Sequence, residues 1–191
     1  MEKDPRTQFL DLWDETIYMF DILKGDLDKT IYILEEKMRL HKNKPASTFF
    51  NEIEPWIRMS IRIVFSTIEA ICFRMKQAAL MICQLKRLPL SEKDKENINE
   101  MTEDGTRHYL KTPENVKYSF KIFSYALGRE SPIEFDKNWF TFISLSEKRN
   151  ELTHPKSLED LKVTPQQHND SAECIKWFFD LLGKIRSSLP G

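Results

Sequence analysis

Three polar residues near the end of one predicted helix have types and spacing suited to chemistry on a phosphate. Arg149 and Asn150 are adjacent, and His154 follows four residues after Asn150. Residues four apart share a helix face, so Asn150 and His154 should point the same way. A guanidinium binds phosphate oxygens, and an imidazole exchanges protons near neutral pH. This set suits in-line displacement at a phosphodiester, which needs proton transfer and stabilisation of the charged phosphorus oxygens.

The element that must position these residues is a helix predicted from about residue 136 to His154. Asp136 can cap its first turn, and Pro155 lacks a backbone N–H and displaces His154 from the α region. His154 is therefore expected at the helix C-terminus, where unpaired carbonyls favour a protonated imidazole. Apolar residues at helical spacing predict the buried face of this helix, namely Trp139, Phe142, Ile143 and Leu145.

The segment Arg-Asn-Glu-Leu-Thr-His-Pro-Lys, residues 149–156, resembles the motif of the HEPN superfamily of small all-α proteins. Members of that superfamily carry an Arg, commonly followed by a polar residue, and then a His after a short gap. Arg149, Asn150 and His154 match this pattern with the shortest of the gaps. By helix pattern the resemblance covers residues 47 to 188, and the motif is its specific part.

The resemblance implies a metal-independent endoribonuclease in which the 2′-hydroxyl of RNA attacks the adjacent phosphate at the interface of a homodimer. His154 would then act as general acid or base, Arg149 would bind the phosphate, and Asn150 would orient the His or the substrate. No cofactor is implied. The family also implies a toxin or host-defence effector, with an antitoxin or another regulatory protein as partner. One variant of the family carries a Tyr two residues after the His, where this chain has Lys156.

Two other interpretations of the motif stay open. In the first, the chain is a non-catalytic HEPN-like module that binds a nucleotide, RNA or a protein through the same surface. In the second, the match is accidental: Arg149 and Asn150 are solvated, and His154 only satisfies carbonyls at the helix end.

A second polar pattern lies on the longest predicted helix, about residues 55 to 86. Its polar residues recur at steps of three or four residues, or at their sum: Arg58, Arg62, Ser66, Glu69 and Lys76. The pattern favours a solvated, ion-paired face. The alternative is that Glu69 packs inward and pairs with Arg149, which would make Glu69 a supporting residue of the site. The apolar surface of this helix is too wide for a surface helix, so it should be the central one.

The fold class indicated by composition is all-α. The chain has 191 residues, and 40% of them are hydrophobic. Glycine is scarce, with 5 residues, whereas phenylalanine is common, with 13. We expect a single-domain, HEPN-like bundle of about six or seven helices. Residues 1–46 are predicted to form an N-terminal helical hairpin that turns at Gly25 and packs on the core, and residues 47–191 the bundle itself.

Local signals predict several helix ends. Ser91 and Thr164 each open a capping box, and Gly128 follows an apolar helix that it should terminate. The last helix is expected to run to about Ser188, with Trp177 either widening its buried side or meeting a second chain.

Charge and cysteine content narrow the function classes. The net charge is −1 and the pI about 6.5, which excludes the broad basic surface of a non-specific nucleic-acid binder but allows a local basic cleft. We find neither a membrane-spanning run nor the apolar core of a signal peptide, so a cytoplasmic protein is expected. The three cysteines, Cys72, Cys83 and Cys174, lie in apolar contexts and are expected to be reduced core residues. The sequence has no zinc-binding cysteine spacing and no metalloprotease motif.

Overall fold

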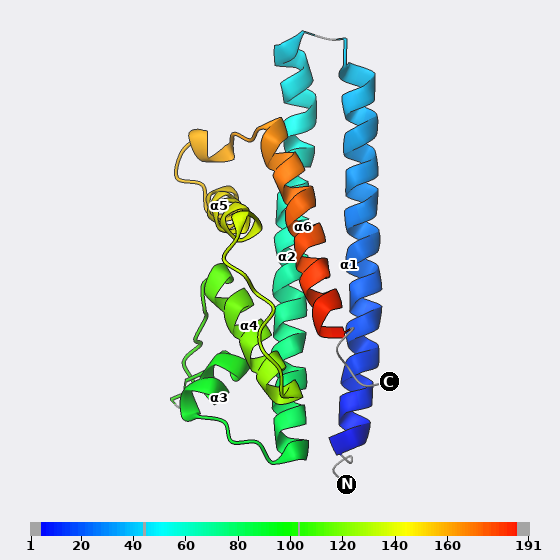
Figure 1. The fold of residues 1–191 in the computed structure, drawn as a ribbon. Coiled ribbons are helices and arrows are strands. Elements are labelled where there is room, and N and C mark those ends of the chain that lie inside the picture. The colour runs from blue at the N-terminus through cyan, green and yellow to red at the C-terminus, as the bar shows by residue number, and fades with distance from the viewer. Residues whose placement is uncertain (1–4, 44, 103, 187–191) are drawn as a thin grey trace. The chain divides into compact units, whose positions relative to one another are not determined.

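The computed structural model describes residues 5–43, 45–102 and 104–186, and this part of the chain is helical, with no strand (Figure 1). In chain order its elements are α1 (Pro5–His41), α2 (Ala46–Lys86), α3 (Glu92–Asn99), α4 (Thr112–Leu127), α5 (Lys137–Thr153), the 3-10 helix η1 (Glu159–Leu161) and α6 (Pro165–Arg186). The prediction of an all-α helical bundle is confirmed. In these ranges no helix combines the length and the apolar character that crossing a membrane requires.

The predicted N-terminal hairpin is wrong, because α1 is one continuous helix (Figure 1). Gly25 lies inside it and does not adopt the positive φ of a helix-ending glycine. One interior Gly costs a helix only about 1 kcal/mol relative to Ala, and no Pro stands beside it to add to that cost. Residues 1–4 and 44 of the predicted hairpin segment lie outside the described residues.

Helix α2 begins at Ala46, earlier than the predicted start near Pro55, which lies inside the helix. An interior proline removes one backbone hydrogen bond but does not always end a helix. Ile53 and Ile57, on either side of Pro55, are both buried, so packing of this segment offsets the lost bond.

The chain forms two compact units. The first comprises residues 1–20, 68–134 and 181–191, and the second comprises residues 21–67 and 135–180. Helices α1, α2 and α6 therefore each contribute a segment to both units. The predicted boundary between residues 46 and 47 lies inside the second unit and stays a prediction.

An aromatic cluster forms the core of the second unit. Phe142 of α5 stacks on Phe65 of α2 at 5.6 Å between ring centroids, and it also contacts Trp177 of α6 at 5.6 Å. Trp139 completes the cluster, 5.5 Å from Phe142 and 6.1 Å from Trp177. Trp177 is only 9% exposed, so its ring belongs to this core. Figure 1 shows α5 nearly end on, crossing the direction of α6.

Caps and buried apolar side chains define the first unit. The Ser91 hydroxyl accepts from the Asp94 N–H, and the Asp94 carboxylate accepts from the Ser91 N–H, so the predicted capping box is present. Gly128 ends α4 with φ 74°, as predicted. The apolar core of the unit includes Ile71, Ile98 and Phe120.

All three cysteines are free and buried, as the sequence predicts. Burial raises the pKa of the Cys72 and Cys174 thiols to about 12, because a buried thiolate loses its hydration. The sequence-predicted end of α6 near Ser188 lies outside the described residues.

Candidate functional site

Helix α5 places the Arg149 motif at its C-terminal end. Its first turn is capped by Asp136, whose carboxylate accepts the Trp139 N–H at 3.0 Å. The helix ends at Thr153, and His154 follows with φ −129° and ψ 62°, outside the helical region. The His154 N–H still donates to the Asn150 carbonyl at 2.9 Å. Both ends of the predicted helix are therefore confirmed.

The three predicted catalytic residues differ in exposure and contacts. Arg149 is half-buried and donates from Nη1 to Asn150 Oδ1 at 3.1 Å, whereas Asn150 and His154 are exposed. The His154 imidazole makes no hydrogen bond to the described part of the chain. The structure thus brings Arg149 and Asn150 into contact and leaves the His154 ring at the surface, with its backbone fixed to the turn before it.

Three cations that the sequence interpretation did not assign to the site bind backbone carbonyls in the last turn of α5 and in the segment that follows it. Arg62 donates from Nη2 to the Leu152 carbonyl, and Arg58 donates from Nη1 to the Leu161 carbonyl at 2.9 Å. Lys148 donates to the Asp160 carbonyl at 3.0 Å. Carbonyls at and after a helix C-terminus lack intrahelical partners, so charged donors stabilise them well.

Hydrogen bonds within the loop that follows the motif also stabilise its conformation. The Asp160 carboxylate accepts the Lys156 N–H at 2.6 Å and the Ser157 N–H at 3.0 Å. These backbone hydrogen bonds, the one from Lys156 first, hold the pKa of Asp160 below its usual value, since they favour the charged carboxylate. His154 is therefore followed at once by a loop with a defined conformation.

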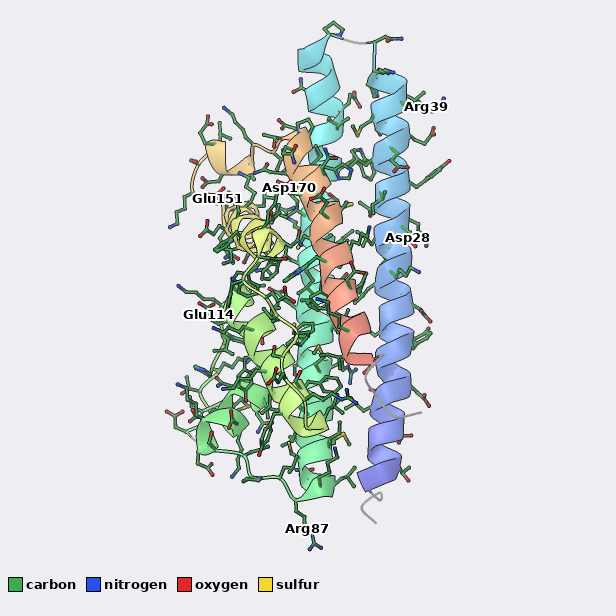
Figure 2. All side chains as sticks on the ribbon, in the orientation of Figure 1. Asp28, Arg39, Arg87, Glu114, Glu151 and Asp170 are labelled. Atoms are coloured by element: carbon green, nitrogen blue, oxygen red, sulfur yellow. The ribbon has the colours of Figure 1, made fainter. Side chains whose placement is uncertain are left out.

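Two of the three cations that bind these backbone carbonyls are paired with a carboxylate. Lys148 contacts Glu151 at 2.9 Å, and both side chains belong to α5, with Glu151 labelled in Figure 2. Arg58 contacts Glu54 at 3.0 Å. Such pairs add little stability at a surface, but they neutralise the cations locally.

Glu69, the predicted supporting residue, accepts a hydrogen bond from the Thr112 hydroxyl at 2.9 Å. Glu69 belongs to the first unit and Arg149 to the second, so their predicted pairing stays a prediction.

The polar pattern on α2 is solvated only in part. Lys76 is buried and donates to Glu100 Oε1 at 2.8 Å, which contradicts a solvated face at that position. The helical spacing of Arg58 and Arg62 is the sequence signal for the loop contacts, but the carbonyls that they bind give no sequence signal.

No group of three or more His, Cys, Asp or Glu residues that could hold a metal ion occurs in the described ranges. Comparisons of the chain with protein-family models, with curated proteins and with solved structures found no match.

Proposed function

We propose that this chain is a metal-independent endoribonuclease of the HEPN kind, with its site at the C-terminal end of α5. The observation that supports the proposal is an exposed imidazole at a helix end, preceded five residues earlier by a guanidinium that contacts Asn150. His154 serves as general acid or base, and Arg149 binds the phosphate and stabilises its charge. Asn150 holds the guanidinium through its side-chain oxygen, and Glu69 is a supporting residue.

The reaction needs two proton transfers. The 2′-hydroxyl loses its proton to a base and attacks the phosphorus, and the 5′-oxygen of the next nucleotide leaves with a proton from an acid. The products are a 2′,3′-cyclic phosphate and a 5′-hydroxyl. One His154 cannot hold both roles at once, so the proposal includes a homodimer in which two motifs face one substrate. The setting implied by the resemblance, a toxin or host-defence effector with a regulatory partner, belongs to the same proposal.

A non-catalytic module is the second candidate, and one observation favours it. The His154 ring has no hydrogen-bond partner in the described chain, whereas a general base is usually oriented by a further group. In that case the same surface binds RNA, a nucleotide or a protein without cleaving it.

The test is an RNA-cleavage assay in EDTA with the full chain. Wild-type protein is expected to cut RNA, and His154→Ala and Arg149→Ala to lose about a hundredfold to a thousandfold in rate, the range for a lost acid, base or charge-stabilising group. Lys156→Ala is the matched control, because it removes a neighbouring exposed cation that has no assigned role.

The two candidates give different outcomes in that assay. Binding of RNA by wild-type chain without any cleavage supports the non-catalytic module. Equal rates for wild type, His154→Ala and Arg149→Ala would mean that the cleavage comes from elsewhere, and would end the proposal.

A further inference from the structure

Two arginines one turn apart on α2 make the same kind of contact with the segment that carries His154. Arg58 donates to the Leu161 carbonyl and Arg62 to the Leu152 carbonyl, on opposite sides of His154 in the sequence. Because the two residues are four apart, they lie on one face of α2. All of these residues belong to the second unit.

The charge on Arg58 is neutralised, whereas the charge on Arg62 is not. Arg58 contacts the Glu54 carboxylate at 3.0 Å, and the two side chains are 23% and 28% exposed. Arg62 is exposed, and its guanidinium contacts no carboxylate of the described residues. A cation that stays unneutralised beside the motif has its attraction for an anion still available.

The contact with Leu152 orients the Arg62 guanidinium and leaves most of its donors for a ligand. An arginine side chain has five N–H donors in a planar fork, and Arg62 uses Nη2 on the carbonyl. Leu152 precedes His154 by two residues, so their Cα atoms are at most about 7.6 Å apart. The guanidinium therefore lies beside the motif in a fixed direction, as bidentate phosphate binding requires.

We propose that Arg62 binds a second phosphate of the substrate, next to the one held by Arg149. The substrate is then a single-stranded RNA that continues beyond the cleaved dinucleotide. The choice of RNA as ligand rests on the proposed function, but the role of Arg62 is measured separately from cleavage. With a net charge of −1, the chain must obtain its affinity for RNA from such local cations.

The experiment measures binding of 2′-O-methyl oligonucleotides, which lack the attacking hydroxyl and so cannot be cleaved. Fluorescence anisotropy with a labelled single-stranded hexanucleotide and a dinucleotide is followed over a series of salt concentrations. The variants are Arg62→Gln and its matched control Arg58→Gln. Glutamine keeps an N–H donor for the backbone carbonyl and removes the positive charge. Circular dichroism and thermal melting check that each variant is folded.

We expect Arg62→Gln to weaken hexanucleotide binding about tenfold, the effect of one charged hydrogen bond. The slope of log K against log salt, which is negative, should become less negative by about 0.7, since one phosphate contact is lost. Dinucleotide binding should not change, and Arg58→Gln should match wild type in both respects. Equal weakening by both variants would mean that Arg62, like Arg58, only stabilises the backbone near the motif, and would overturn the proposal. Unchanged binding by Arg62→Gln, or no binding by wild type, would also overturn it.

These outcomes separate the two proposals. If wild type binds the hexanucleotide through Arg62 but never cleaves RNA, the endoribonuclease proposal fails and the phosphate contact stands. If RNA is cleaved in a His154-dependent way and Arg62→Gln binds the hexanucleotide as wild type does, the phosphate contact of Arg62 fails and the endoribonuclease proposal stands.

Discussion

The two halves of α2 carry similar polar residues with opposite surroundings. In the first unit, Lys76 is 1% exposed and bonded to Glu100, and Glu69 accepts from the buried Thr112. In the second unit, Arg62 bonds to the last turn of α5 and Arg58 bonds to η1, which follows α5, and Arg62 is exposed.

This difference teaches how to separate structural polar groups from candidate functional ones. A buried cation with a partner of opposite charge is already satisfied, so Lys76 and Glu100 have little left to offer a ligand. An exposed cation oriented by a backbone carbonyl keeps most of its donors. Burial and bonding partners, rather than residue type or spacing, therefore divide the polar pattern on α2 into structural residues and candidate functional ones.

The largest expected effect is on stability and comes from removing the buried cation Lys76, which is paired with Glu100. Lys76→Ala should lower the free energy of unfolding by about 3 kcal/mol, because it leaves a cavity and an unpaired Glu100. Lys76→Met, which keeps the side-chain volume and removes the charge, should cost less. Chemical denaturation measures both. A loss under about 1 kcal/mol for Lys76→Ala would show that the buried pair contributes no more than a surface pair.

A smaller effect concerns the helix that the sequence interpretation divided in two. Gly25→Ala should raise the free energy of unfolding by up to about 1 kcal/mol, because Gly25 is helical and nothing lies within 4 Å of the added Cβ. Gly128→Ala is the control with the opposite sign, since φ is 74° there. A destabilised Gly25→Ala would mean that α1 does turn at this residue.

The smallest effect concerns the exposed loop beside His154. Backbone hydrogen bonds lower the pKa of Asp160, so the folded state holds the proton less tightly than the unfolded state does. The contribution of Asp160 to stability is therefore present above its usual pKa of 3.8 and is lost as the pH falls through the lower, folded value.

NMR titration of the Lys156 and Ser157 amides measures this directly. Both signals should move together with a midpoint below 3.8, and Asp160→Asn should abolish the shift. A midpoint at or above 3.8 would contradict the loop geometry.

The helix boundaries that were predicted correctly depend on local chemistry. Asp136, Ser91 and Gly128 act within one turn of themselves, as caps do, and so their effects can be inferred from neighbouring residues. The end of α5 shortly before Pro155 follows for the same reason. Gly25 gives a weaker signal, because glycine both ends helices and occurs inside them at modest cost.

The contacts of Arg58 and Arg62 with backbone carbonyls could not be predicted, because they join distant parts of the sequence. Arg62 and Leu152 are 90 residues apart, and Arg58 and Leu161 are 103 apart. Their acceptors are backbone carbonyls, which every residue has, so no residue type marks them. Periodicity places Arg58 and Arg62 on one face of α2 but does not identify what that face contacts.

The measurement that tests the central claim most directly is the chemistry of the RNA ends produced by the wild-type chain in EDTA. The proposed site predicts 2′,3′-cyclic phosphate and 5′-hydroxyl ends, no cleavage of RNA methylated at the 2′-oxygen, and loss of these products in His154→Ala. Ends that carry a 5′-phosphate, or products that persist undiminished in His154→Ala, would contradict a reaction driven by the 2′-hydroxyl and His154.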